Sequence, residues 1–552
     1  MPELLAFGAL GFLQIFHLGI GEILPYDESL YLIRVRAIEK FDCWLDQTQY
    51  AVGGLYSSTH PPLVIWMMTL TRMLFGTGNF SSRLIAALAG IVALLTLYKL
   101  LSRFYSRWTS LLSVVFVGTA QNFLWYSHHA QLDIPLLAFV IIASYYFVVA
   151  IDADDFLSSV LSGLFLGCAL LTKAVQGLYI LPFFITYAYQ FRKTNSFRLL
   201  GLTLGLGFMI AIPWYLFMTL QHPDFTSQYF GLVNSIQSGS YNNRSDTRWW
   251  YYLNQSLVSY PILSIAIFGV IGRLKSKVQE NKRSRAILLL SIIWFVAMHI
   301  FVSSFKTQMP HFTLLLTVPT IYFVAAGIER ILTTQYRTII LACATILSLI
   351  FFAWSSSEII RGAIKGQWQL EWSPEVIVSF GILLVIMLLG YYLQRGFKLE
   401  NGLILIFLLA SVSYFGSFGR IAMRDETVYI DGAKSVSELL KDNPTINSVT
   451  AYYDDVIFQS QLPQLNYYSD GLFLGWDNTR NGTARTWDKL DQLRISGVRP
   501  LTQATIIYNS WDGFHKASEN QKSLLSRINL YHGSYYRQHL HTKKYDLYWG
   551  RK

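Results

Sequence analysis

Long apolar runs alternate with short polar loops over the first 421 residues of this chain. Runs of roughly 17–22 apolar residues are long enough to cross a bilayer core of ~30 Å as helices. The pattern therefore predicts an all-α polytopic membrane domain. We expect thirteen transmembrane helices, near residues 4–24, 84–101, 109–125, 132–151, 156–172, 176–191, 198–219, 257–272, 286–304, 311–329, 337–354, 375–393 and 401–421.

Two apolar stretches need a separate interpretation. Pro62–Phe75 is shorter than a span and opens with a pair of prolines, so we expect a helix lying at the membrane interface. The run near residues 4–24 has no basic leader, and acidic residues rather than a small-residue cleavage site follow it. We interpret it as a retained first span and not as a removed signal peptide.

Basic residues gather in every second loop, which orients the chain. If the N-terminus lies in the cytoplasm, the short outer loops after spans 3, 5, 9 and 11 carry only Lys173, Lys306, Arg361 and Lys365. The cytoplasmic loops then hold Arg103, Arg107, Arg192, Lys193, Arg198, Arg273, Lys275, Lys277, Lys282, Arg283, Arg285, Arg330, Arg337, Arg395 and Lys398. This is the positive-inside pattern of cytoplasmic (inner) membrane proteins, and it places the C-terminus outside.

The composition changes after the last predicted span. From about Asp425 the charged and polar residues increase, and residues 519–525 suggest one amphipathic helix. Short β-rich runs appear at Ser448–Tyr453, Ala504–Tyr508 and Tyr545–Trp549. We therefore expect a membrane domain over 1–424, with outer interfacial loops at 25–83 and 220–256, and an extracytoplasmic α/β domain over 425–552.

The overall composition fits this class of protein. The chain is 53% hydrophobic and 14% charged, whereas soluble chains average about 25% charged residues. Much of the net charge of +11 lies in loops that set the topology, so it implies no nucleic-acid partner. The three cysteines, Cys43, Cys168 and Cys343, form neither a disulfide framework nor a zinc-binding pattern.

Unusual polar residues gather on the predicted outer side. Asp27 and Glu28 directly follow the first span, and adjacent carboxylates at a membrane surface are costly enough to suggest a function. The same side holds His60, His128, His129, Asp133, Lys173, Asp224, Arg244, Asp246, Arg248, Lys306 and His311. Segments far apart in the sequence thus bring acidic and basic residues to one face, as a shared site requires.

The candidate residues also have structural explanations. Either member of Asp27-Glu28 could cap the helix that follows, and Asp133 could do the same for its span. Lys173 could instead extend its side chain to the lipid headgroups.

Two further groups of polar residues are expected to be structural. His128 and His129 are interpreted as interfacial residues. Asp152, Asp154 and Asp155, which form an acidic cytoplasmic loop, are interpreted as solvated turn residues.

The residue types favour group transfer from a lipid phosphate. Carboxylates can orient and deprotonate a hydroxyl, while Lys, Arg and His can hold a phosphate and stabilise its charge as it departs. No Gly-rich nucleotide-binding loop is evident, and a cytosolic nucleotide could not reach the outer face. A divalent cation could bind to the carboxylates together with His60, but the spacing does not decide this, so the metal requirement is left open.

Seven short motifs occur in an order that resembles a known family. They are Tyr26-Asp27-Glu28, His60-Pro61-Pro62-Leu63, Gln131-Leu132-Asp133, Leu170-Leu171-Thr172-Lys173, Ile212-Pro213-Trp214-Tyr215, Arg244…Arg248-Trp249-Trp250-Tyr251-Tyr252 and Lys306…Pro310-His311-Phe312. The chain resembles the GT-C glycosyltransferases of the protein O-mannosyltransferase and aminoarabinose lipid A transferase superfamily, and it is closer to the bacterial aminoarabinose-transferase-like branch. The thirteen spans and outer C-terminal domain of that family agree with the topology above.

The resemblance implies that a sugar moves from a polyprenyl-phosphate donor to a lipid, glycan or protein acceptor outside the cytoplasm. It implies catalytic roles for Asp27, Glu28 and Asp133. It implies contacts to the donor phosphate or substrate from His60, Lys173, Arg244, Lys306 and His311. His60 stands where the aminoarabinose transferases typically have Lys, and Phe312 stands near a position that is often Tyr in relatives. These departures argue against assuming aminoarabinose as the sugar or lipid A as the acceptor.

Two other classes of function compete with sugar transfer. A lipid or sugar transporter, or flippase, would favour charges near the bilayer midplane and paired repeats. Here the charges gather near the outer ends of helices and no repeat is visible. A structural subunit that binds a partner through the outer domain is the third hypothesis.

Overall fold

The computed structural model describes residues 2–24, 27–51, 55, 58–191, 193–239, 249–260, 262–274, 282–333, 432–443, 449–452, 464–465, 467–468, 504–508, 536–542 and 545–551. The spans predicted near 337–354, 375–393 and 401–421 lie outside the described residues. The chain divides into two compact units. The first contains Met1–Leu18, Arg83–Gln221 and Leu232–Arg424, and the second contains Gly19–Ser82, His222–Gly231 and Asp425–Lys552.

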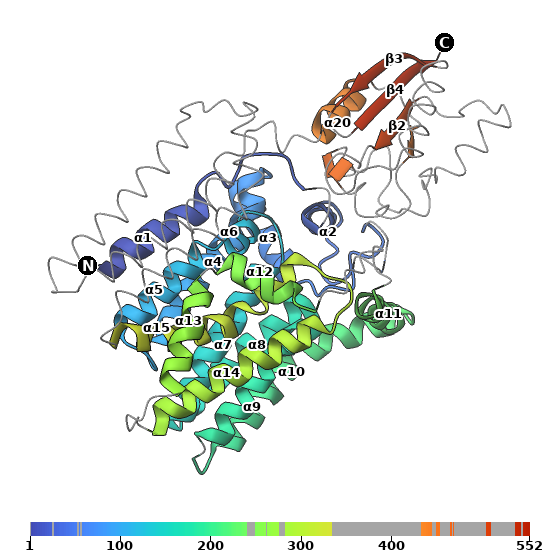
Figure 1. Ribbon diagram of the computed structural model, residues 1–552. Helices are drawn as coiled ribbons and strands as arrows, with labels where there is room; N and C mark the ends of the chain where they lie inside the picture. Colours follow the sequence, from blue (N-terminus) through green and yellow to red (C-terminus); the bar gives the residue numbers. More distant parts are fainter. Residues whose placement is uncertain are drawn as a thin grey trace, which may run out of the picture. The chain divides into compact units, whose positions relative to one another are not determined.

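The first unit is mostly helical (Figure 1). Its helices, two of which begin in the second unit, are α1 (Pro2–Ile15), α4 (Asn79–Leu101), α5 (Arg107–Gly118), α6 (Gln121–Ser127), α7 (Asp133–Ala153), α8 (Phe156–Lys173), η1 (Ala174–Ile180), α9 (Leu181–Gln190), α10 (Ser196–Gln221), α11 (Phe225–Ser238), α12 (Tyr251–Ser259), α13 (Ile262–Leu274), α14 (Lys282–Ser303), η3 (Pro310–Leu314) and α15 (Thr317–Thr333). Five segments in the described residues are long and apolar enough to cross a membrane, namely Asn79–Leu101, Asp133–Ala153, Phe156–Lys173, Ser196–Gln221 and Arg285–Ser303. The chain is a multi-pass membrane protein, as its sequence predicts.

The turn between α7 and α8 shows how polar residues separate two long apolar runs. Asp154 ends α7 in the left-handed conformation, with a φ of 58°. Asp155 is the N-cap of α8, and its carboxylate accepts hydrogen bonds from the Ser158 hydroxyl at 2.5 Å and from the backbone N–H groups of Ser158 at 3.1 Å and Leu157 at 3.2 Å. These bonds hold the pKa of Asp155 below its usual value. The two backbone bonds also satisfy amides that the first turn of a helix leaves without a partner.

Asp152 corrects one expectation about the same loop. It is a residue of α7, and its Oδ2 lies 2.6 Å from a nitrogen of Arg283 and 3.2 Å from a nitrogen of Arg103. Its Oδ1 accepts a hydrogen bond from the Tyr187 hydroxyl at 2.9 Å. Asp152 is therefore not a solvated turn residue, because partners from three other segments of the first unit converge on it.

Several predicted spans are interrupted. The span predicted over 109–125 consists of α5 and α6, with the backbone extended at Ala120 between them. The span predicted over 257–272 is divided between the last residues of α12, which ends at Ser259, and α13, which begins at Ile262 directly after Pro261 in the sequence. Proline lacks a backbone N–H and disfavours the helical conformation of the residue before it, which accounts for the second break.

The first predicted span is also shorter than the apolar run. The helix α1 ends at Ile15, and His17 has a φ of 59°, which a continuing helix cannot accommodate. The ring of His128 lies against this helix end, with Nε2 at 3.0 Å from the Phe16 carbonyl oxygen. His128 and His129 are 5% and 3% exposed, so both side chains are buried within the protein, and their location at the membrane interface stays a prediction.

Small residues let α8 and α10 approach each other closely. A Cβ added at Gly163 would lie 2.8 Å from the carbonyl oxygen of Thr203, and one at Gly167 would lie 2.8 Å from Cβ of Ile210. On the same face, Ser159 Oγ donates a hydrogen bond to the Leu199 carbonyl at 2.8 Å. Such faces of small and hydroxyl residues are typical of packed transmembrane helices.

The second unit contains α2 (Asp27–Phe41), α3 (Leu63–Phe75) and, near the C-terminus, α20 (Ala433–Asp442) with four strands. Helix α3 has 13 residues. At 1.5 Å per residue it is roughly 20 Å long, which is too short for a bilayer core of ~30 Å. The interpretation of this stretch as a helix that does not span is consistent with that length.

The strands form a mixed sheet in the order β1-β2-β4-β3, with β1 at Val449–Tyr452, β2 at Ala504–Tyr508, β3 at Tyr536–His541 and β4 at Tyr545–Arg551 (Figure 1). The strands β1 and β2 are parallel, while β4 is antiparallel to both β2 and β3. Helix α20 packs on one face of this sheet, where Val436 and Leu440 share a buried core with Leu465, Ile506 and Leu547.

Candidate functional site

The two adjacent carboxylates begin α2 but have different surroundings. Glu28 is 0% exposed, and its Oε2 accepts a hydrogen bond from the backbone N–H of Leu24 at 2.8 Å. Asp27 is partly exposed, and within the described part of the chain its carboxylate has no hydrogen bond or ion pair. Glu28 therefore binds the backbone of the segment that leads into α2.

A short C-terminal segment holds the backbone that precedes Asp27. The side-chain amide of Gln464 donates to the Ile23 carbonyl at 2.7 Å, and the Ile23 N–H donates to the Tyr468 hydroxyl at 2.8 Å. Glu22, which precedes α2 in the sequence, accepts a hydrogen bond at 3.2 Å from the backbone N–H of Lys434 near the start of α20. Burial raises the pKa of Tyr468, and the nearby carboxylates add to this, so its hydroxyl keeps its proton.

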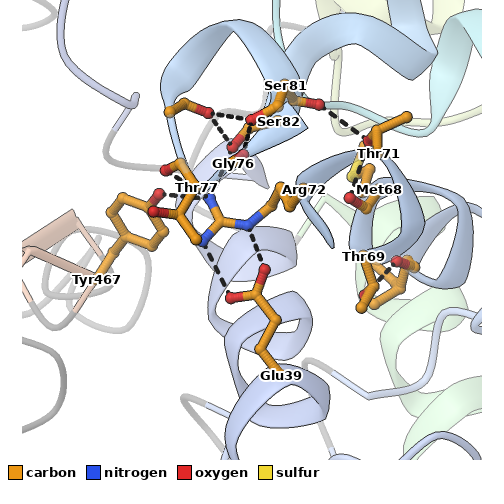
Figure 2. Close-up of polar contacts among 12 residues, drawn as sticks. Glu39, Met68, Thr69, Thr71, Arg72, Gly76, Thr77, Ser81, Ser82 and Tyr467 are labelled. Carbon is orange, nitrogen blue, oxygen red and sulfur yellow. Dashed lines mark hydrogen bonds and ion pairs between the residues drawn. The ribbon is translucent and has the colours of Figure 1, made fainter. Parts of the chain in front are cut away.

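Arg72 of α3 is the centre of a buried cluster in the same unit (Figure 2). It is 1% exposed, and Glu39 of α2 binds it in a bidentate manner, at 2.6 Å from Nε and 3.0 Å from Nη2. Its Nη1 donates to the Ser82 hydroxyl at 2.8 Å, the Thr77 carbonyl at 3.2 Å and the Tyr467 hydroxyl at 3.0 Å. Burial disfavours the charged guanidinium, but the hydrogen bond and charge of Glu39 outweigh it and raise the pKa of Arg72. The cluster fixes α2 relative to α3.

We expect Arg72→Lys to destabilise the second unit although it keeps the positive charge. Lysine cannot reproduce the planar, bidentate contact to Glu39, and it cannot also reach Ser82, Thr77 and Tyr467. The loss of one or two charge-assisted bonds is worth roughly 1.5–3 kcal/mol each. The thermal unfolding midpoint of the purified protein measures this effect. Lys434→Arg is the control, because the side chain of Lys434 is exposed. Equal unfolding midpoints for the wild type, Arg72→Lys and Lys434→Arg would contradict the prediction.

Arg34, also on α2, is a buried charge that the sequence did not single out. It is 1% exposed, and Gln47 Oε1 accepts hydrogen bonds from its Nε at 3.2 Å and Nη2 at 2.9 Å. Burial lowers the pKa of Arg34 to about 10, and the charge of Asp46 partly opposes this. The guanidinium therefore remains charged at neutral pH.

His60 lies beside the same helix. Its ring is 6.0 Å from the ring of Tyr31, in an edge-to-face arrangement. Tyr31 is four residues after Asp27, and residues four apart lie on the same face of a helix. The second unit thus brings the His60-Pro61-Pro62 motif to the side of α2 that begins with Asp27.

Asp133 and Lys173 form an ion pair inside the first unit. Asp133 is the first residue of α7 and Lys173 the last of α8, and Lys173 Nζ lies 2.9 Å from Oδ1 and 3.0 Å from Oδ2 of Asp133. The two side chains are 5% and 3% exposed. The ion pair explains the position of Lys173 better than extension to lipid headgroups does, because the ammonium group is buried.

The remaining candidates occupy the loop after α14. The side chain of Lys306 is exposed, while its backbone N–H donates to the Gln237 carbonyl at 3.2 Å. His311 lies in η3, where its ring is 6.3 Å from that of Tyr126. The Tyr252 hydroxyl accepts a hydrogen bond from the Met309 N–H at 3.0 Å and so fixes this loop. Arg244 lies outside the described residues.

Several known membrane glycosyltransferases are similar to this chain in sequence. A family model described as dolichyl-phosphate-mannose-protein mannosyltransferase matches residues 59–217, which include His60, Asp133 and Lys173. The undecaprenyl phosphate-alpha-4-amino-4-deoxy-L-arabinose arabinosyl transferase of Shewanella sediminis is 25% identical over 372 residues, which are 65% of this chain and 65% of that protein. Its counterpart from Pseudomonas savastanoi is 24% identical over 275 residues, or 48% and 50% of the two chains. The chain thus spans about half to two thirds of the length of these relatives.

Solved structures extend the similarity over nearly the whole chain. The crystal structure of ArnT from Cupriavidus metallidurans bound to undecaprenyl phosphate aligns with a TM-score of 0.67 at 16% identity, over 98% of this chain and 97% of that one. This chain has a GT-C fold. The oligosaccharyltransferase AglB from Archaeoglobus fulgidus aligns with a TM-score of 0.51 at 12% identity, over 92% and 70% of the two chains. The GT-C resemblance expected from the sequence motifs is confirmed.

Proposed function

We propose that this GT-C protein is an integral-membrane glycosyltransferase. It moves a sugar from a polyprenyl-phosphate donor to a lipid, glycan or protein acceptor on the outer side of the cytoplasmic membrane. The observation that carries the proposal is the Asp27 carboxylate, which has no ion pair or hydrogen bond among the described residues while its neighbour Glu28 is bound to the backbone. The similarity to ArnT bound to undecaprenyl phosphate supports the class of donor.

In the proposed reaction, Asp27 accepts the proton of the acceptor hydroxyl as that oxygen forms a bond to the anomeric carbon of the sugar. The bond between this carbon and the phosphate oxygen breaks, and polyprenyl phosphate leaves with the electron pair. Glu28 positions Asp27 through its bond to the backbone, and Asp133 is the second acidic residue. Positive charge stabilises the departing phosphate, and the residues proposed for this are His60, Lys173, Arg244, Lys306 and His311.

The topology belongs to the same proposal. Thirteen spans and a cytoplasmic N-terminus place all these residues on the outer side, together with an extracytoplasmic α/β domain at 425–552. The helix and mixed sheet described in this C-terminal region support the α/β class. The basic loops of the sequence support the orientation.

The proposed sidedness predicts that a cysteine at Glu438 of α20 is labelled by an impermeant thiol reagent in intact spheroplasts. The side chain of Glu438 is 60% exposed, so the reagent can reach it. In a background without the native cysteines, Thr194→Cys is the matched control, since it lies exposed in a loop expected to be cytoplasmic. The proposed orientation would be wrong if the Thr194→Cys variant is labelled in intact spheroplasts while the Glu438→Cys variant is labelled only after permeabilisation.

A transfer assay tests the function itself. Purified protein is mixed with a panel of undecaprenyl-phosphate sugars labelled in the sugar, and the products are identified by mass spectrometry. Comparison of lipid and glycan pools from cells with and without the gene then identifies the acceptor. We expect labelled acceptor and free polyprenyl phosphate in equal amounts. Movement of intact donor across a vesicle membrane without cleavage of the sugar–phosphate bond would instead support a flippase.

A further inference from the structure

Two histidines and one aspartate converge on the hairpin formed by β3 and β4. His539 and His541 are two residues apart on β3, so their side chains lie on the same face. Asp546 of β4 is the direct register partner of His541. Its Oδ1 lies 2.8 Å from Nε2 of His539 and 2.7 Å from Nδ1 of His541. Two imidazole nitrogens and a carboxylate oxygen therefore meet at one point.

The strands hold these three groups rigidly. Strand β4 lies between β2 and β3, and Asp546 is 2% exposed. Leu547, the next residue, belongs to the core under α20, so Asp546 points to the opposite face of the sheet. The ring of His539 stacks on that of Tyr548, with centroids 4.2 Å apart and planes inclined by 6°. Such stacking fixes the ring orientation, as neighbouring contacts do for metal ligands.

We propose that His539, His541 and Asp546 form a binding site for a divalent transition metal ion of the zinc type. Their donor atoms lie within 4.8 Å of one another. Zinc binds imidazole nitrogen and carboxylate oxygen at about 2.0–2.2 Å in tetrahedral geometry, which separates ligand atoms by roughly 3.3 Å. To admit the ion, the two nitrogen–oxygen distances of 2.8 Å and 2.7 Å would have to lengthen by about half an ångström. Three protein ligands leave the fourth position for water.

The site shares no residue with the proposed sugar-transfer site and does not rest on that function. Its ligands come from two paired strands near the C-terminus, so the ion would join β3 to the central strand β4. A bound ion thereby stabilises the fold of this sheet, and the stabilisation grows with the logarithm of the free ion concentration once the site is filled. The competing explanation is that the two imidazoles only donate hydrogen bonds to the buried Asp546 carboxylate.

The test uses the full-length protein, purified in detergent and treated with a chelator. Titration with ZnCl₂ by calorimetry is expected to show one strong site, and CoCl₂ is expected to give the absorption bands of tetrahedral cobalt. His541→Ala should weaken zinc binding at least about 100-fold, since each ligand supplies a large share of the binding free energy. The His541 side chain is 67% exposed, so this variant leaves the core intact.

A matched control is present in the same unit. His222 and Asp46 form a His–Asp pair at 2.7 Å, and no third potential metal ligand converges on this pair among the described residues. We expect His222→Ala to leave the zinc and cobalt signals unchanged. Equal zinc affinity in the wild type and His541→Ala, or the absence of tetrahedral cobalt bands, would overturn the proposal and leave a hydrogen-bonded cluster.

Discussion

Asp27→Asn is expected to reduce the rate of sugar transfer by roughly 10²–10⁴-fold, the usual contribution of a general base. Asparagine is nearly isosteric with aspartate and suits a helix start, so the protein should remain folded in the membrane. It cannot accept a proton from the acceptor hydroxyl or orient it through a negative charge. Donor binding should be largely retained, because the proposed phosphate contacts come from basic residues. Transfer rate and donor affinity, measured on the same purified variant, check both expectations.

Glu28→Gln is the informative comparison for Asp27→Asn. It leaves an oxygen that can accept the Leu24 N–H, and so it should preserve the start of α2. We expect a smaller loss of rate than for Asp27→Asn, since Glu28 acts through the position of its neighbour. If Asp27→Asn transfers sugar at a near-normal rate while Glu28→Gln is inactive, then the base is Glu28 and the role proposed for Asp27 is wrong.

The long spans could be predicted because their boundaries are local in the sequence. The turn of Asp154 and Asp155 between two apolar runs predicts where α7 ends and α8 begins, and the helices lie within a few residues of the expected spans. The early end of α1 could not be predicted in this way. His17 and Leu18 continue the run without a strong breaker, and the contact from His128 to Phe16 depends on tertiary structure.

The sequence motifs select candidate residues for the site but do not indicate the contacts of these residues. The motif order selected Asp27, Asp133 and Lys173, yet nothing in the sequence indicated that the last two form a pair across 40 residues. Arg72 was overlooked because it sits in the otherwise apolar run of α3. Its bond to the Tyr467 hydroxyl joins residues 395 positions apart, and no local pattern records such a contact.

The pair of Asp133 and Lys173 gives the second large effect. Lys173→Met leaves a buried carboxylate without its ammonium partner, and breaking a buried ion pair from one side typically costs about 3–5 kcal/mol of stability. The family resemblance implies a contact from Lys173 to the donor phosphate or substrate, so the loss of Lys173 should weaken donor use. Because the Lys173 side chain is only 3% exposed, its loss should also lower the stability of the fold substantially. A marked fall in the unfolding midpoint of Lys173→Met is the expected result, and an unchanged midpoint would contradict the buried pair.

The double variant Asp133→Asn with Lys173→Met separates structure from catalysis. It removes both charges from the same buried position, so most of the stability lost in Lys173→Met should return, because replacing both partners of such a pair is often neutral. Donor affinity and transfer rate are then measured on this stable protein. If the pair also serves the reaction, the double variant should be stable but slow, and a lost phosphate contact alone would weaken donor binding by roughly 1.5–3 kcal/mol. If the stable double variant has normal donor affinity and a normal transfer rate, then Asp133 and Lys173 have only a structural role, which is to connect α7 to α8.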